Sequence, residues 1–334
     1  MKEALLSVKN LSIGIRRFSK RGRIELLSSV EDVSFDIYPG EILGIVGESG
    51  SGKSLTALSI PGLLGEDKEV SGGSILLEEN GMARNLLTLC EKDLEAVRGK
   101  EISMVFQEPF SSLNPLVKVG AQIAETLVLH GEKDKSLITG RVRELMEKLR
   151  LPEPEKLMES YPHQLSGGMC QRVMIALAVI FRPRLLIADE PTTALDQSTQ
   201  GQIITLLREI NRGFGTAVLF ISHDLSQIRE FCSRVLVMYS GRILEEGDTE
   251  EVFNKPAHEY TKGLLGSIPA RARRGQDLVS IPGRIPSLEE GRPRGCPFHP
   301  RCAKADSRCK GEFPPERTVG ANHRTHCVLE EQDD

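Results

Sequence analysis

A glycine-rich loop between a short apolar run and a Lys-Ser pair limits this 334-residue chain to few folds. The apolar run of residues 42–46 predicts a buried parallel strand, and the glycines that follow let backbone N–H groups turn inward. A helix is expected to start at about Lys53. Strand, loop and helix in this order form a phosphate-binding loop, which predicts an α/β fold.

The residue types in this loop predict binding of a nucleoside triphosphate with Mg2+. The positive end of the helix faces the phosphates, Lys53 reaches the β and γ phosphates, and the Ser54 hydroxyl ligates Mg2+. A glycine-rich turn without a ligand is the alternative, but it leaves the coincidence of strand, glycines, Lys-Ser and helix unexplained. The candidate nucleotide-binding residues here are Gly47, Glu48, Ser49, Gly50, Ser51, Gly52, Lys53, Ser54 and Leu55.

Two acidic residues follow a second apolar run. Residues 185–188 predict a strand that delivers Asp189 and Glu190 to the carboxyl edge of the sheet, where open α/β folds place their ligands. Asp189 is expected to hold Mg2+ through water, and Glu190 to orient and polarise the water that attacks the γ phosphate. Acids that decorate a helix N-terminus are the structural alternative, and both interpretations can be true together.

Further motifs lie in a definite order around these two sites. They are Gln107 in the sequence MVFQEP, residues 165–169 with the sequence LSGGM, Asp196 in ALD, and His223 in FISHD. Together with the phosphate-binding loop and the paired acids, they resemble the motifs of the ATP-binding cassette (ABC) ATPases. The resemblance runs from about residue 5 to residue 250.

This resemblance implies a role for each motif. Gln107 matches the Q-loop glutamine, which contacts the metal and the attacking water, so Gln107 joins Ser54 as an expected Mg2+ ligand. His223 matches the switch histidine, which hydrogen-bonds the γ phosphate. The expected catalytic residues are Glu190, His223, Gln107 and Lys53. The residues expected to complete the ATP site of a partner subunit are Ser166, Gly167 and Gly168 of the signature motif and Asp196 of the D-loop.

Two single positions qualify the resemblance. Met169 stands at the last position of the signature motif, where the family most often has Gln. The change is expected to cost little, because Ser166 and Gly168 are the residues that touch the partner's γ phosphate. Phe18 is the candidate for the aromatic side chain that stacks on adenine.

The resemblance also implies a domain organisation. We expect a P-loop NTPase fold, an ABC nucleotide-binding domain with a RecA-like core, an antiparallel β subdomain and a helical subdomain. The ABC ATPase domain is expected at residues 1–252, with its helical subdomain at about 108–178, and a C-terminal extension at 253–334. Apolar residues at three- and four-residue spacing predict helices in 120–130 and 139–149, and residues 71–77 predict a hairpin edge.

The C-terminal extension contains four of the seven cysteines: Cys296, Cys302, Cys309 and Cys327. Disulfides are not expected in a reducing cytosol, so the crowding favours metal binding. The intervals between these cysteines match neither the close pairs of zinc ribbons nor bacterial ferredoxin runs, so spacing alone does not identify the metal.

Residues 295–306 resemble the C-terminal extension of ATPase subunits from oligopeptide and dipeptide importers, as does the stretch from Gln107 to Pro115. Some members of that group carry a [4Fe-4S] cluster on four such cysteines, so the resemblance implies this cluster here, as a structural staple for a core-poor tail. Zinc is the alternative, on the same ligands or on three of them with His299, His323 or His326. An extension without metal also stays open.

The importer resemblance implies the partners and the location of the chain. A second ABC ATPase subunit, usually a different chain, two transmembrane permeases and an extracytoplasmic substrate-binding protein are expected. The chain is expected to be a peripheral protein at the cytoplasmic face of the cell membrane, because it lacks a signal-peptide pattern and an apolar run of about 20 residues. With 43 basic and 47 acidic residues, it presents no broad positive field for nucleic acid.

Three functions compete for this set of motifs. A transport ATPase that energises oligopeptide or dipeptide uptake agrees with the single cassette and the importer-type tail, and uptake of nickel chelates or oligosaccharides would use the same ATPase. A DNA-repair ATPase would need long coiled-coil heptads between its nucleotide motifs, which this sequence lacks. A ribosome-associated ATPase would carry two cassettes in one chain.

Overall fold

The computed structural model describes residues 3–18, 24–79, 81–268 and 281–329. The chain divides into two compact units. Unit 1 comprises residues 1–37, 42–87 and 221–334, and unit 2 comprises residues 38–41 and 88–220. The C-terminal tail therefore belongs to the same unit as the phosphate-binding loop, although more than two hundred residues separate them in the sequence.

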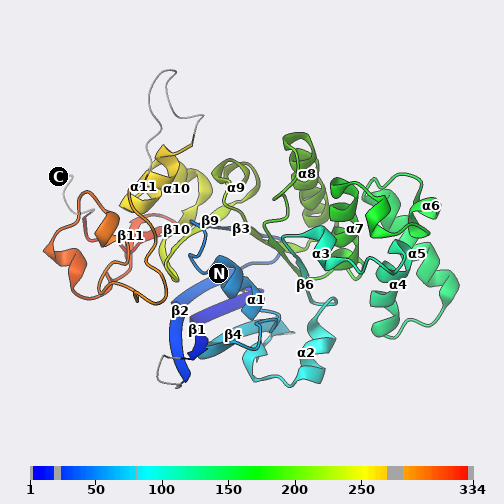
Figure 1. The fold of residues 1–334 in the computed structure, drawn as a ribbon, viewed down its shortest axis with the longest axis horizontal. Helices are drawn as coiled ribbons and strands as arrows, with labels where there is room; N and C mark the ends of the chain where they lie inside the picture. The colour runs from blue at the N-terminus through cyan, green and yellow to red at the C-terminus, as the bar shows by residue number, and fades with distance from the viewer. Residues whose placement is uncertain (1–2, 19–23, 80, 269–280, 330–334) are drawn as a thin grey trace. The chain divides into compact units, whose positions relative to one another are not determined.

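Unit 1 contains an antiparallel sheet with the strand order β2-β1-β4-β5, and Figure 1 shows β1, β2 and β4 side by side. Its strands are β1 (Leu6–Phe18), β2 (Ile24–Ile37), β4 (Lys68–Glu79) and β5 (Met82–Asn85). Alternating residues of β1, such as Leu6 and Val8, are buried, as expected for a sheet with one covered face. The expected antiparallel β subdomain is present in unit 1.

The hairpin expected at residues 71–77 is present. These residues lie in β4, which forms an antiparallel hairpin with β5 at the edge of this sheet, and β5 pairs with residues 76–79 of β4. The short strand β5 returns through a tight turn at Gly81, whose φ of 82° suits a residue without a side chain. Because β5 is short and half polar, its residue pattern offers little indication of a strand.

The second sheet of unit 1 contains strands in the order β11-β12-β10-β9-β3. Strand β3 pairs with β9 in parallel, and the other neighbours are antiparallel. The strands are β3 (Ile42–Val46), β9 (Arg234–Tyr239), β10 (Arg242–Asp248), β11 (Arg317–Gly320) and β12 (His323–Thr325). The helices of unit 1 are α1 (Lys53–Ser59), α9 (Leu225–Phe231), α10 (Thr249–Asn254) and α11 (Glu259–Gly266).

The tail adds two strands to this sheet. In β12, Thr325 lies opposite Glu245 of β10, and His323 lies opposite Gly247. His323 and Thr325 are buried, as is Phe298 in the loop before them. The sequence predicted a small, core-poor appendage, but strand pairing with β10 supplies backbone hydrogen bonds that the tail could not make alone.

Unit 2 contains strands in the order β8-β7-β6 and a group of helices. Helices α4 to α8 are green in Figure 1. The strands are β6 (Ile102–Val105), β7 (Leu185–Asp189) and β8 (Ala217–Ile221), whose last residue is assigned to unit 1. The helices are α2 (Glu91–Val97), α3 (Pro109–Ser112), α4 (Val119–Leu129), α5 (Lys135–Lys148), α6 (Pro154–Met158), α7 (Gly167–Val179) and α8 (Gln197–Phe214). Helices α4 and α5 confirm the helical spacing found in the sequence.

Among the residues that the structure describes, no helix combines the length and the apolar character that a membrane span requires.

Candidate functional site

The phosphate-binding loop follows β3 directly and leads into α1, as the sequence predicted. Residues 43, 45 and 46 of β3 are buried, and β3 lies beside β9 in a parallel pair. Gly47 has a φ of 153°, and a Cβ atom at this position would overlap the carbonyl oxygen of Met238 at the end of β9. The loop therefore starts where only glycine fits between two strands.

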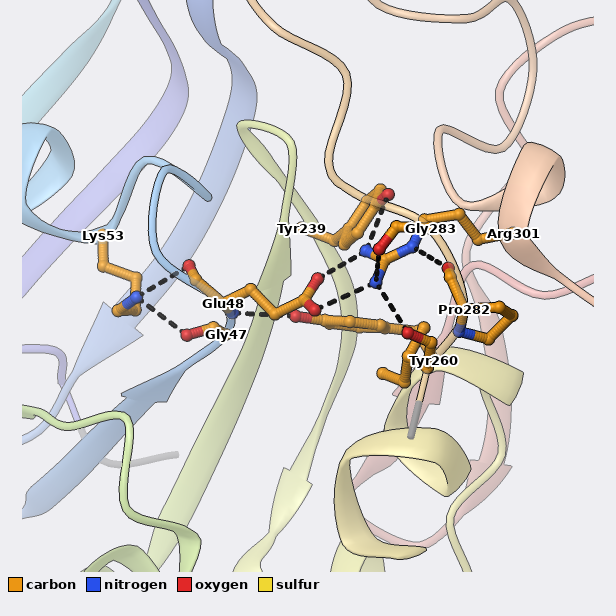
Figure 2. A network of polar contacts seen from close by, with 9 residues as sticks. Gly47, Glu48, Lys53, Tyr239, Tyr260, Pro282, Gly283 and Arg301 are labelled. Atoms are coloured by element: carbon orange, nitrogen blue, oxygen red, sulfur yellow. Dashed lines mark hydrogen bonds and ion pairs between the residues drawn. The ribbon is translucent and has the colours of Figure 1, made fainter. Parts of the chain in front are cut away.

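Lys53 is buried and folded back onto the loop. Its ammonium group donates hydrogen bonds to the carbonyl oxygens of Gly47 at 2.8 Å and Glu48 at 3.0 Å. These contacts place the charge of Lys53 against the backbone of the loop, beside Gly47 and Glu48 (Figure 2). A phosphate that entered the loop would meet a pre-positioned cation and backbone N–H groups.

His223 belongs to unit 1 with this loop. The preceding residue, Ser222, donates its backbone N–H to the carbonyl oxygen of Ile45 in β3 at 3.3 Å. The Ser222 hydroxyl also accepts the Asp224 N–H at 3.0 Å, which shapes the turn around His223. His223 is exposed and directly follows Ser222, which is hydrogen-bonded to β3, the strand that leads into the phosphate-binding loop.

In unit 2, the structure brings together two predicted residues that are 83 positions apart. The Gln107 side-chain amide donates to the Glu190 carboxylate at 3.2 Å, and the Thr193 hydroxyl donates to the same oxygen at 2.9 Å. Asp189 is buried at the end of β7, one residue before Glu190. Glu190 thus has a fixed side-chain position at the carboxyl edge of the strand, where the sequence predicted it.

The signature residues form the start of α7. Ser166 is the N-cap residue, and its hydroxyl accepts the Met169 N–H at 3.3 Å. A Cβ atom on Gly168 would lie 2.7 Å from the Thr199 methyl group in α8, so close helix packing requires glycine here. Gly167 has more room, because a Cβ atom there would lie 3.6 Å from its nearest neighbour, the Leu195 side chain.

Asp196 begins α8 as its N-cap residue. Its carboxylate accepts the Thr199 N–H at 3.0 Å and the Thr199 hydroxyl at 2.6 Å. The hydrogen bond from the Thr199 hydroxyl is the largest cause that holds the pKa of Asp196 below its ordinary value. Asp196 and Gly168 therefore both contact Thr199, which links the D-loop to the signature motif inside unit 2.

Phe18 is the last residue of β1, and its side chain lies outside the part of the chain that the structure describes. The adenine-stacking role expected for it stays a prediction.

The four tail cysteines line one cavity in unit 1, with His258, His299 and His326 at its wall. The Cys296 sulfur lies 3.6 Å from the His258 Nε2 atom, and the Cys296 N–H donates to the Cys309 carbonyl oxygen at 3.0 Å. Burial raises the pKa of the Cys296 thiol to about 12, and it also raises the pKa values of Cys302 and Cys327. The fold thus brings together cysteines that lie up to 31 residues apart in the sequence.

The histidines that the sequence offered as zinc ligands have other partners. The buried His323 ring contacts the Glu245 carboxylate at 2.7 Å, and His326 and His299 contact the carbonyl oxygens of Pro314 and Cys296. Within the described ranges, no three His, Cys, Asp or Glu side chains form a group that could hold a metal ion as they stand. The structure thus gathers the four thiols without supporting the predicted metal site.

Sequence reasoning missed a network that joins the tail to the phosphate-binding loop. The Arg301 guanidinium makes a two-pronged ion pair with the Glu48 carboxylate, at 2.6 Å and 3.0 Å (Figure 2). The Tyr260 hydroxyl accepts the Glu48 backbone N–H at 2.9 Å. No local sequence pattern predicts either contact, because Arg301 and Tyr260 lie 253 and 212 residues from Glu48.

The fold and these motifs define an ATP-binding cassette ATPase. A family model described as "ABC transporter" matches residues 30–193, and one described as "Oligopeptide/dipeptide transporter, C-terminal region" matches residues 244–309. Among solved structures, a dimeric ATP-binding cassette in a post-hydrolysis state with ADP and phosphate has a TM-score of 0.63 and 28% identity, covering 73% of this chain and 98% of that chain.

Curated relatives identify the family within this class. The oligopeptide transport ATP-binding protein OppD of Escherichia coli is 45% identical over 94% of this chain and 90% of its own length. The dipeptide transport ATP-binding protein DppD of Bacillus subtilis is 41% identical over 99% of this chain and 96% of its own length. The chain belongs to the ATP-binding subunits of the oligopeptide/dipeptide ABC transporter family.

Proposed function

We propose that this chain hydrolyses ATP to energise the import of oligopeptides or dipeptides through separate permease subunits. The observation that carries the proposal is the Gln107–Glu190 hydrogen bond, which fixes a carboxylate at the end of β7. This arrangement suits a base that orients water for attack on a γ phosphate. The similarity to OppD and DppD over nearly the whole chain supports the peptide substrate.

Unit 1 contributes phosphate binding in this proposal. Backbone N–H groups of residues 47–54 and the Lys53 ammonium group surround the β and γ phosphates, and His223 donates to the γ phosphate. The side chains of Ser49 and Ser51 complete the loop, and Leu55 follows in the first turn of α1. The observed Lys53 contacts to loop carbonyls support this role, because they hold the cation at the loop before any phosphate arrives.

Mg2+ fits the donor set of the predicted ligands. The Ser54 hydroxyl, the Gln107 amide oxygen and, through water, the Asp189 carboxylate are hard oxygen donors, which Mg2+ prefers. When bound, Mg2+ neutralises charge on the β and γ phosphates. Glu190 then accepts the proton of the attacking water, and its contacts to Gln107 and Thr193 keep its carboxylate directed while it does so.

A second ABC ATPase subunit completes each site in this proposal, and we infer a heterodimer. Ser166, Gly167 and Gly168 present the N-terminal end of α7, which has 13 residues, to the γ phosphate bound by the partner, and Asp196 lies at the same interface. The cap made by Ser166 leaves further N–H groups of the first turn available for an anion. The tight contact between Gly168 and Thr199 supports a rigid signature segment.

The remaining assembly follows from the family. We place the chain at the cytoplasmic face of the membrane, as a peripheral subunit bound to two permease subunits. An extracytoplasmic substrate-binding protein delivers the substrate to these permeases. ATP binding would close the two ATPase subunits and hydrolysis would reopen them. This rigid-body motion would drive the permeases, because ATP is present only in the closed state.

The test of ATP hydrolysis is the Glu190→Gln variant, measured with the permeases in proteoliposomes. We expect ATP turnover to fall by about 100-fold or more, while ATP binding is retained, because Gln cannot accept the proton. Glu209→Gln is the matched control, since Glu209 lies on α8 and pairs with the exposed Arg150. Unchanged turnover in Glu190→Gln would refute the assignment of the base.

Uptake assays identify the substrate. Cells that lack the gene are supplied with a labelled oligopeptide, a labelled dipeptide, a nickel chelate or an oligosaccharide, and are compared with cells that express the chain. Peptide uptake restored by the wild type and lost in Glu190→Gln is the expected result. Restored uptake of the nickel chelate or the oligosaccharide alone would replace the peptide with that substrate.

We also propose that Cys296, Cys302, Cys309 and Cys327 hold a [4Fe-4S] cluster. The chemistry of the donor set supports this proposal, because four thiols line one cavity and iron–sulfur clusters are bound by cysteine thiolates. Cluster binding would release protons from the thiols of Cys296, Cys302 and Cys327, whose pKa values burial raises, and would cross-link the tail. The proposed cluster is tested on anaerobically purified protein. Its visible absorption spectrum is recorded, and its iron, sulfide and zinc contents are measured. Stoichiometric zinc without iron, or neither metal, would refute the cluster.

A further inference from the structure

Glu48 is the only acidic residue within residues 47–54 of the phosphate-binding loop. A carboxylate so close to an anion-binding loop repels phosphate, and this repulsion is weakly screened where the surroundings are partly buried. The Glu48 side chain is 31% exposed, so water screens it only in part. The negative charge of Glu48 therefore opposes phosphate binding, and a cation fixed beside it would reduce this repulsion.

Arg301 supplies that cation. It pairs with both carboxylate oxygens of Glu48, at 2.6 Å and 3.0 Å, and its own side chain is only 6% exposed. Two parallel N–H···O bonds fix the orientation of the carboxylate and place a positive charge beside it. The ion pair raises the pKa of the Arg301 guanidinium above its already high ordinary value, so Arg301 stays charged.

The tail holds Arg301 rigidly. The guanidinium also donates to the Pro282 carbonyl oxygen at 2.8 Å and, at longer distances of 3.4 Å, to those of Ile281 and Gly283. Figure 2 shows the guanidinium between the Glu48 carboxylate and the carbonyl groups of Pro282 and Gly283. An arginine with every prong engaged by neighbouring groups acts as a fixed point charge rather than a mobile surface group.

Tyr260 forms a second attachment to the same loop residue. Its hydroxyl accepts the Glu48 N–H at 2.9 Å, and its ring packs against Tyr239 and Phe298, with centroid distances of 4.7 Å and 5.2 Å. Phe298 lies three residues before Arg301 in the tail. The side chain of Glu48 is therefore held by Arg301, and its backbone N–H is held by Tyr260, whose ring packs against Phe298 of the tail.

We propose that Arg301 is a positioning residue for ATP binding: by holding the Glu48 carboxylate, it makes the affinity of the phosphate-binding loop depend on the folded tail. This inference rests on the proposed function, because ATP is the ligand concerned. The alternative is that Arg301 only ties together the carbonyl groups of residues 281–283 and stabilises the tail, with no effect on the nucleotide that is transmitted through Glu48.

A double-mutant cycle separates these two roles. Arg301→Gln, Glu48→Ala and the double variant are made in the full chain, and ATPase KM, kcat and MgATP affinity by calorimetry are measured. We expect Arg301→Gln alone to raise KM for ATP and Kd for MgATP on the order of tenfold, with kcat changed less than about twofold. In the Glu48→Ala background, Arg301→Gln should change KM by less than about twofold, because its target is gone.

The matched control is Arg284→Gln. Arg284 also forms an Arg–Glu pair in the tail, with Glu290 at 2.6 Å, but it is 80% exposed and does not reach the loop. Its removal should leave KM unchanged. An Arg301→Gln effect of equal size with and without Glu48 would overturn the proposal, since Arg301 would then act through the stability of the tail or the neighbouring cysteines.

A reciprocal measurement covers the case in which Arg301→Gln fails to fold. Glu48→Ala leaves the bonds from Arg301 to the tail carbonyls in place, so the tail should stay folded. Because coupling is reciprocal, MgATP should slow amide hydrogen exchange in residues 296–302 of the wild type and not of Glu48→Ala. Equal protection in both would refute the coupling. A wild type that does not bind ATP would instead refute the proposed function.

Discussion

The phosphate-binding loop and the C-terminal tail lie in the same unit, but they are built in different ways. The loop is formed by consecutive residues between β3 and α1, and its internal contacts, such as Lys53 to Gly47, span six positions. The tail is held by contacts such as His323 to Glu245, which span 78 positions. The comparison teaches that a local motif can carry the chemistry while remote contacts decide how firmly it is held.

Glu245→Ala should have the largest effect and tests the tail side of this comparison. Glu245 is fully buried and accepts the Ala257 N–H at 2.7 Å and the His258 N–H at 2.9 Å, besides its contact with His323. Removing the carboxylate leaves these groups without their buried partner, so the free energy of unfolding should fall by about 3–5 kcal/mol. Denaturant unfolding measures the change.

The control for this variant is Glu316→Ala. Glu316 pairs with Arg324 at 3.1 Å on the exposed side of the same tail, where an ion pair contributes about 0–1 kcal/mol. If both variants lost the same small amount of stability, the buried carboxylate would not be what anchors the tail.

Gly47→Ala tests the loop side and should have an intermediate effect. The new methyl group would overlap the Met238 carbonyl oxygen, so β3, β9 or the loop must shift, at a cost of about 1–3 kcal/mol in unfolding free energy. ATP affinity should fall as well, because the loop N–H groups move with Gly47. Gly201→Ala in α8, which has open space around it, should instead raise stability by about 1 kcal/mol.

The Gly47→Ala prediction requires a loss in both measurements. Stability and MgATP affinity are determined on the same preparation by denaturant unfolding and calorimetry. Full ATP affinity in Gly47→Ala would show that the loop tolerates the shift and that its local geometry is less demanding than its sequence suggests.

Thr199→Val should have the smallest effect, on the pKa of Asp196. Valine keeps the methyl group that packs on Gly168 but removes the hydroxyl that donates to Asp196, so the lowered pKa should rise toward its ordinary value. In the wild type, the N-cap contribution of Asp196 is present above the pKa of the unfolded chain and is lost as pH falls through the lower folded pKa. NMR titration of the Asp196 carboxyl carbon measures both values, and identical curves would exclude the hydroxyl as the cause.

Elements and positions that depend on neighbouring residues in the sequence were predicted correctly. The start of α1 at Lys53, the position of Asp189 at the end of β7 and the helices α4 and α5 all follow from apolar periodicity and from the glycine pattern. The ABC fold and the family were also predicted, and the comparisons confirm them. Each depends on short-range rules that apply to the sequence alone.

Contacts between residues that lie far apart in the sequence were predicted partly or not at all. The sequence placed Gln107 and Glu190 in one site only through the family resemblance, while their hydrogen bond is a product of β6 and β7 pairing in parallel. The tail strands β11 and β12 were missed because they are short and polar, and they form by pairing with β10. Strand β5, the partner of β4 in the hairpin, was missed for a similar reason.

The sequence by itself determined the class of chemistry: a glycine loop with Lys53 and Ser54, and a strand that ends in Asp189 and Glu190, dictate nucleotide handling through adjacent residues. Only the tertiary structure decided that Arg301 pairs with Glu48, that Tyr260 accepts its N–H, and that four cysteines face one cavity. The physical reason is that backbone conformation follows from neighbouring residues, whereas an ion pair across 253 positions exists only after the whole core has packed.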